Sequence, residues 1–226
     1  MTPSAMWREE RSDLRDLWQS VEVFRFPLPA KREGASPVAT AAEWFANDVD
    51  AFWARAFGDA DLTFRPPTYR VFDQTISSRC GDLWPGIAAL YCGLDAGVYL
   101  DERWISLHVL PEYGVTGVAY LIAHETAHSV QFQRDIFITS RRQELQADCL
   151  AGAYLQARVE AGVLQAGAVE NLPSLIRRGG DDAVSNLIGT DSYLESHGTG
   201  QQRLTLFRRG YEVGIKGCGL ELNGRD

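Results

Sequence analysis

The chain has 226 residues, of which 45% are hydrophobic and 23% are charged, and its formal net charge is −8. This composition is that of an ordinary globular protein, and the length allows one sizeable core or at most two small domains. The negative charge argues against nucleic acid and anionic membranes as main partners, since both require a basic surface. No segment reaches the roughly 18 apolar residues of a membrane span, and the first twenty residues are too charged for a secretory signal.

Residues 1–35 have the character of an extension. Trp7, Leu14, Trp18 and Val21 recur at helix-like spacing, and the Pro- and Gly-bearing connector FPLPAKREGASP follows. We therefore predict an N-terminal arm, residues 1–35, and a single main domain, residues 36–226.

The main domain opens with a predicted helix. TAAE at 40–43 has the form of a capping box, in which Thr40 and Glu43 satisfy each other's backbone donors. An apolar stripe at a spacing of about 3.6 residues follows, which is typical of a helix packed on a core: Trp44, Phe45, Val49, Phe52, Trp53 and Phe57.

The next segments read as β-structure. PPTYRVFDQTIS predicts a strand, and ALYCGLDAGVYLD predicts a hairpin around a Gly-containing turn. Its second run, AGVYL, is either an edge strand that pairs with an extended peptide or an internal strand. DERWISLHVL is a short amphipathic segment ended by Pro111, and His108 within it has no acidic partner nearby, so we expect it to be structural.

Two helices are then predicted, at about 115–134 and 141–161, and the first contains LIAHETAHSVQ. On a helix, His124 and His128 lie on one face, about 6 Å apart along the axis. Two imidazoles so placed can bind one zinc ion at about 2.0–2.1 Å. Glu125, about 100° around the helix, can take a proton from a zinc-bound water, whose pKa the metal lowers towards about 7. The pattern predicts a metalloprotease-type site.

A catalytic zinc keeps three protein ligands and one open position, so a third ligand must follow. Glu144, in RRQELQADCLAG, comes 16 residues after His128, beyond a link short enough for the second helix to fold back. Asp148 shares a face with Glu144 and can hold the free nitrogen of a ligand histidine. Small side chains would let the two helices approach closely: Ala147, Ala151 and Gly152. We predict one zinc per chain, held by His124, His128 and Glu144.

Simpler interpretations stay open at these positions. The two histidines can be ordinary core residues, and Glu144 can be a solvated charge in the first turn of a helix, where acids are favoured. Asp148 can be a structural hydrogen-bond partner alone. A zinc site with four protein ligands is less favoured, because Glu125 beside the ligands would then have no role.

The tail contains SHGTGQQRLTLFRRGYEVG, in which Thr199 and Gln202 can cap a last helix. A peptidase also needs a donor for the oxyanion that forms on the scissile carbonyl. His197, between glycines in a loop, is our first candidate, and Tyr193 and Arg203 are weaker ones. A loop-fixing histidine is an equally open interpretation of His197.

Taken together, these residues resemble the bacterial neutral zinc metallopeptidase family, a gluzincin-like group. The likeness runs from about residue 48 through six blocks in order: CG at 80–81, YCGLDAGVYLD at 91–101, AHETAHSVQ, ELQADCLAG, IGTD at 188–191 and SHGTGQQR at 196–203. The resemblance implies a zincin-like α+β fold, mainly helical, with a small hairpin or sheet next to the HExxH helix. It also implies a zinc-dependent peptidase with ligands His124, His128 and Glu144 and with Glu125 as base.

The departures from the family pattern lie outside the proposed metal ligands. Ala127 and Ser129 stand where relatives tend to have Gly and His, and IGTD stands where an acidic pair is expected. These differences concern substrate preference. Many relatives also carry an N-terminal membrane anchor, so the resemblance favours the cell envelope or secretion, although we expect no such anchor in this chain.

The four cysteines allow three full pairings, and none lies in a C-x-x-C motif. Cys80 and Cys92 flank the hairpin region, so we predict that they form a disulfide, with Cys149 and Cys218 as a second pair. Disulfides would indicate an oxidising compartment, whereas without them the cytosol is the default.

Three functions remain on this sequence. The first is a zinc endopeptidase acting on a peptide or protein substrate. The second is a zinc amidase of narrow specificity, for example towards cell-wall peptides, since the same chemistry serves any amide. The third is a non-catalytic peptide-binding protein with a structural zinc.

Overall fold

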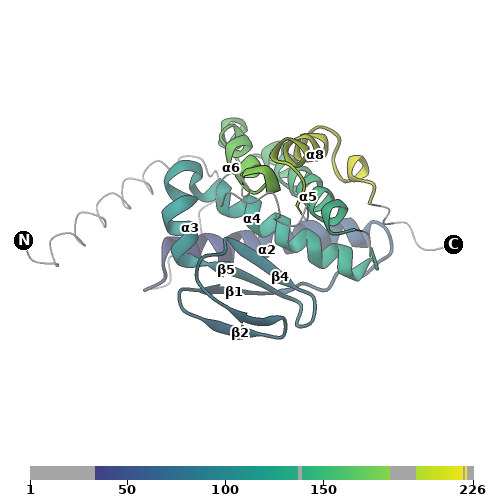
Figure 1. Cartoon of the computed structure of the whole chain (residues 1–226). Helices are drawn as coiled ribbons and strands as arrows, with labels where there is room; N and C mark the ends of the chain where they lie inside the picture. Colours follow the sequence, from purple (N-terminus) through teal and green to yellow (C-terminus); the bar gives the residue numbers. More distant parts are fainter. Residues whose placement is uncertain (1–33, 137–138, 184–196, 221, 223–226) are drawn as a thin grey trace, which may run out of the picture.

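The computed structural model describes residues 34–136, 139–183, 197–220 and 222. The predicted arm therefore lies almost entirely outside the described residues. The elements follow in the order α2 (Pro37–Gly58), β1 (Thr68–Phe72), β2 (Ile76–Ser78), β3 (Gly81–Leu83), β4 (Ala89–Cys92), β5 (Gly97–Asp101), α3 (Glu102–His108), α4 (Leu110–Gln133), α5 (Ser140–Glu160), η1 (Ala166–Val169), α6 (Leu172–Arg178), α8 (Gly200–Val213) and η2 (Ile215–Cys218). The fold is α+β and mainly helical, as predicted, with α4 between the small sheet and helices α5 and α8 (Figure 1).

Helix α2 begins earlier than the sequence suggested. Ser36 is its N-cap, with the Oγ accepting from the Ala39 N–H, and Pro37 occupies the first helical position. The predicted capping box at Thr40 is wrong, because that residue already lies inside the helix and donates its hydroxyl to the Ser36 carbonyl. Proline is pre-organised for the first turn, which makes Ser36 the stronger start signal.

The main sheet has three strands in the order β1–β5–β4, and β2 and β3 form a separate hairpin. Strands β4 and β5 pair antiparallel, so the predicted hairpin is confirmed, while β1 runs parallel to β5. All five residues of β5 are buried. AGVYL is therefore an internal strand, and the edge position next to α4 belongs to β4.

Helix α4 is the buried centre of the molecule. From Thr116 to Ala127 every residue is buried, since the sheet, α2 and α5 all pack against this helix. A residue with non-helical backbone angles, Gly114 (φ 57°), produces a kink after the first turn of this helix. Both helices expected around the HExxH motif are present, with ends displaced by a few residues.

Helices α5 and α8 touch backbone to backbone. A Cβ on Gly152 would lie 2.1 Å from the Phe207 carbonyl oxygen, and one on Gly210 would lie 1.7 Å from the Cys149 carbonyl oxygen. Gly152 was expected to bring α5 close to α4, but it faces α8. The small residue correctly indicated a close approach, and the partner depended on the tertiary arrangement.

The cysteines pair as predicted. Cys80 bonds to Cys92, and Cys149 on α5 bonds to Cys218 in η2.

The last helix also starts as predicted, with reciprocal capping between Thr199 and Gln202. Among the described residues, no helix combines the length and apolar character that a bilayer crossing requires.

The glycine contact between α5 and α8 can be tested with Gly210→Ala. The added methyl group has no room against the α5 backbone, so the helices must separate, and we expect the free energy of unfolding to fall by about 1–3 kcal/mol or more. Gly58→Ala is the control, because a Cβ there meets nothing within 4 Å. Urea denaturation followed by circular dichroism measures both, and equal stabilities of the two variants would contradict the close packing.

Candidate metal centre and active site

Three side chains from two helices converge at the centre of the molecule. His124 and His128 come from α4, and Glu144 comes from the first turns of α5. One ligand atom of each lies within 4.8 Å of the others. The Nε2 atom of His124 is 3.1 Å from Glu144 Oε2, and that of His128 is 3.4 Å from Oε1. The structure thus brings together the three residues that the sequence proposed as ligands.

The spacing of these atoms suits a zinc ion. Atoms at about 2.0–2.1 Å from a tetrahedral metal lie about 3.3–3.4 Å from one another. The two histidine nitrogens lie 3.1 and 3.4 Å from the two different oxygens of Glu144, and one ligand atom from each residue lies within 4.8 Å of the others, so the three side chains are close enough to converge on one ion. Two imidazoles and one carboxylate are also the donor set of many catalytic zinc sites, in which a fourth position stays open.

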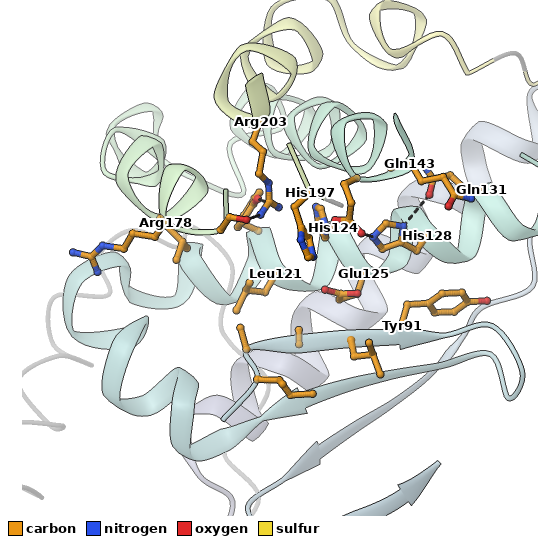
Figure 2. A pocket seen from close by; sticks show the side chains of 18 of the residues that line it. Tyr91, Leu121, His124, Glu125, His128, Gln131, Gln143, Arg178, His197 and Arg203 are labelled. Atoms are coloured by element: carbon orange, nitrogen blue, oxygen red, sulfur yellow. Dashed lines mark hydrogen bonds and ion pairs between the residues drawn. The ribbon is translucent and has the colours of Figure 1, made fainter. Parts of the chain in front are cut away.

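Glu125 occupies the side of α4 that faces β4. Its carboxylate extends towards the cleft between the helix and that strand (Figure 2), and the residue is 8% exposed. Burial raises the pKa of Glu125, while the neighbouring histidines and a hydrogen bond from the Tyr91 backbone N–H act in the opposite direction. The carboxylate is therefore beside the three converging side chains without being one of them.

Behind His124 lies a buried charged cluster. His124 Nδ1 is 3.0 Å from Asp148 Oδ1, an ion-pair distance, although the contact falls short of a well-aligned hydrogen bond. Asp148, fully buried, also accepts from the Tyr120 hydroxyl at 2.7 Å and from Arg203 at 2.8 and 3.0 Å. Asp148 thus occupies the position behind a histidine that the helix spacing predicted.

The guanidinium of Arg203 is held mainly within the protein, at the inner end of the cleft. Its guanidinium donates to Asp148, to the Gly179 carbonyl at 2.6 Å and to the Tyr120 hydroxyl at 3.3 Å, and the side chain is 8% exposed. The sequence suggested Arg203 as a weak oxyanion-donor candidate; most of its donors bind other groups of the protein, so His197 stays the first candidate. Tyr193, the other weak candidate, lies outside the described residues.

The carboxylates control the charge of this centre. Burial disfavours a protonated His124, but Asp148 and Glu144 outweigh it and raise the pKa of the ring to about 10. Burial would raise the pKa of Glu144, yet the two histidines lower it well below its usual range. Arg203 and His124 likewise overcome burial and lower the pKa of Asp148 to about 2. The centre therefore attracts positive charge, either a proton or a metal ion.

His197 reaches the same cleft from the segment before α8 (Figure 2). Its Nδ1 is 3.2 Å from Asp181 Oδ1, and Asp181 also accepts the backbone N–H groups of His197 and Gly198. The carboxylate thus fixes both the loop and the ring. Sequence reasoning missed Asp181, since no periodic spacing connects it to a histidine 16 residues later.

The cleft has a volume of about 950 Å³ and follows α4 on both sides of the two histidines. Leu121 lines it on one side and Phe132 on the other, 11 residues apart, which is about 16 Å along a helix. His108, expected to be structural, is an exposed lining residue whose ring stands 5.1 Å from that of Trp104. Strand β4 forms the opposite wall.

Comparison with known proteins identifies the family. A family profile described as "Putative neutral zinc metallopeptidase" matches residues 34–219. The chain belongs to this family. The family description supports a zinc-dependent hydrolase, and the converging side chains supply a possible metal site.

The curated relatives are distant. The chain is 29% identical over 185 residues to the uncharacterized protein YpfJ of Escherichia coli K12, a match that covers 72% of this chain and 63% of the relative. It is 26% identical over 195 residues to the uncharacterized protein Rv2575 of Mycobacterium tuberculosis, covering 74% and 65%. The chain thus spans somewhat less than two thirds of the length of these relatives. No solved structure matches the chain.

The buried cluster predicts a large effect of Arg203→Leu. The substitution leaves the Asp148 carboxylate in the core without its guanidinium, so the free energy of unfolding of the metal-free protein should fall by about 3–5 kcal/mol. Urea denaturation measures the loss, and Asp148→Asn in the same chain should restore part of it. The control is Arg178→Leu, because Arg178 is 60% exposed and pairs with Glu112 at the surface. Equal stabilities of the two arginine variants would exclude a structural role for the cluster.

Proposed function

We propose that this protein is a zinc-dependent peptidase with His124, His128 and Glu144 as ligands and Glu125 as general base. One observation carries the proposal: two helices bring these ligand atoms within 4.8 Å of each other, beside a nearly buried carboxylate that is not among them. A site that only held a metal for stability would have no use for Glu125 in the cleft.

His124, His128 and Glu144 would hold a zinc ion, which would supply a water of lowered pKa and polarise the carbonyl oxygen of an amide. Glu125 faces the cleft from the same helix and can accept the proton of the attacking water, then pass it to the leaving amine. Asp148 lies behind the ring of His124, next to its Nδ1. Its negative charge helps to orient the ring and favours positive charge on it.

The edge of β4 that faces α4, with which no strand of the described residues pairs, suits an extended peptide. The Ala88 carbonyl accepts from Asp101 on β5, so the alternation of an antiparallel pair turns the backbone groups of Ala89 and Tyr91 away from β5. Both residues line the cleft, and the Tyr91 N–H already meets Glu125. A substrate strand can therefore pair with the remaining edge groups. From the sequence, AGVYL, which forms β5, was a possible strand for pairing with a peptide. In this proposal the pairing strand is β4 instead.

The extent of the cleft favours an endopeptidase over a narrow amidase. Leu121 and Phe132 lie about 16 Å apart on either side of the histidine pair, a span of about five extended residues. A substrate of that length places residues on both sides of the scissile bond. A narrow amidase would need only a small, closed pocket.

His197 is the proposed oxyanion donor. Asp181 contacts its Nδ1 at 3.2 Å, and the ring lines the cleft, where a ring N–H can serve as a donor to the oxyanion. Two disulfides also support an oxidising compartment, since such bonds are rare in the cytosol.

Glu125→Gln tests the proposal. The amide cannot accept the proton of the attacking water, so turnover of internally quenched peptides should fall by about 10²- to 10⁴-fold. Zinc content, measured by inductively coupled plasma mass spectrometry, should stay near one ion per chain. Glu112→Gln is the control, because Glu112 is an exposed acid on the same helix.

The outcomes separate the three functions. A wild-type protein that takes up no zinc would refute the proposal outright. Zinc binding with hydrolysis of small amides alone would favour the amidase. Tight zinc binding without any turnover, and unchanged cellular behaviour of Glu125→Gln, would favour the non-catalytic peptide-binding protein.

A further inference from the structure

The ring nitrogen of His128 that points away from Glu144 has its own partner. His128 Nδ1 is 2.9 Å from Oε1 of Gln131, one turn further along α4. Gln131 is 1% exposed, so its amide has little access to water. Gln131 thus lies beside the Nδ1 atom of His128, as Asp148 lies beside the Nδ1 atom of His124.

The orientation of this amide follows from its other neighbours. Gln131 Nε2 donates to the Gln143 backbone carbonyl at 2.8 Å and to Gln146 Oε1 at 3.0 Å. A backbone carbonyl only accepts, so the nitrogen must face it and the oxygen must face His128. The His128 ring is then the donor at Nδ1, which leaves the lone pair of a neutral ring on Nε2, the nitrogen beside Glu144.

The chain of amides continues to the end of the domain. Gln146 Nε2 donates to the Cys218 carbonyl at 3.1 Å, which fixes the second amide in the same sense. Cys218 lies in η2, and its sulfur is bonded to Cys149 on α5. The Cys218 carbonyl is the last acceptor in this row of hydrogen bonds. The disulfide therefore holds it against α5, the helix that bears Gln146.

We propose that Gln131 and Gln146 form a positioning relay through which the Cys149–Cys218 disulfide supports His128 as a metal ligand. This inference rests on the proposed function, because it takes His128 to bind the ion. The relay holds the ring angle and places the proton on Nδ1, so that Nε2 is free to bind. A chain in which these two cysteines are reduced loses the anchor of the relay and binds zinc more weakly. Zinc affinity thus depends on whether Cys149 and Cys218 are joined.

The first experiment measures zinc affinity by competition with a chromophoric chelator. Gln131→Leu removes the acceptor at His128, and we expect a loss of about 10- to 100-fold, the usual effect of removing a partner behind a metal ligand. Gln146→Leu removes one of two acceptors of the Gln131 amide, and its loss should be smaller. Gln133→Leu is the matched control, since Gln133 lies on the same helix and bonds to Arg65 and Ser129 instead.

The second experiment removes each disulfide by paired Cys→Ser substitution. Loss of Cys149–Cys218 should lower zinc affinity, whereas loss of Cys80–Cys92, which touches no member of the relay, should not. In the Gln146→Leu background, removal of Cys149–Cys218 should cost no further affinity, because both changes break one chain. General destabilisation would instead give additive losses.

Nuclear magnetic resonance of the zinc-loaded protein supplies an independent readout. The His128 Nδ1 proton should be protected from exchange in the wild type and lose this protection in Gln131→Leu. Wild type that binds zinc, together with Gln131→Leu of equal affinity, would overturn the relay and leave the proposed function standing. Additive losses in the cysteine cycle would overturn the link to the disulfide. Absence of zinc binding in the wild type would instead remove the proposed function itself.

Discussion

A single buried carboxylate determines how three helices of this protein meet. Asp148 on α5 is fully buried and receives hydrogen bonds from Tyr120 on α4 and Arg203 on α8. An ionised group away from water is tolerated only when it is paired and fully hydrogen-bonded. Displacement of α8 would remove its guanidinium, and displacement of α4 would remove the hydrogen bond from the Tyr120 hydroxyl. The same atom that Tyr120 contacts also stands beside His124, so the packing of the core and the orientation of the metal site have one common origin.

The sheet contributes the opposite wall, and its strand order decides which backbone is available. Because β5 is internal, β4 presents its edge to α4, and Glu125 lies between them. Under the proposed function, main-chain recognition and proton transfer would therefore take place across one narrow gap. A peptide substrate of the proposed kind would be held by its backbone, with its side chains in the cleft on both sides of the histidine pair.

Local patterns in the sequence were enough to predict much of this. Helical periodicity placed His124 and His128 on one face, and a short link brought Glu144 back to them, since neither inference needs a distant contact. The capping of α8 was confirmed for the same reason. At the start of α2 two capping signals competed, and the conformational preference of Pro37 favoured Ser36.

Other features depend on contacts between distant segments, which local patterns do not contain. The pairing of Asp181 with His197 crosses a long connection, and the commitment of Arg203 to Asp148 joins two helices 55 residues apart. The orientation of the Gln131 amide follows from its hydrogen bond to the Gln143 carbonyl on another helix, which the local sequence pattern does not contain. Gly152 indicated a close approach, but the identity of the approaching helix came from the assembled core.

The Cys149–Cys218 bond closes a covalent ring across 69 positions of the chain. His197, Arg203 and most of α5 lie within that ring, whereas the HExxH helix lies outside it. Under the proposed function, each molecule is exposed to hydrolysis by its own neighbours in solution. One cut between these cysteines would open the ring without releasing a fragment, so the nicked molecule would still carry α8 tethered to α5 and would separate into pieces only on reduction.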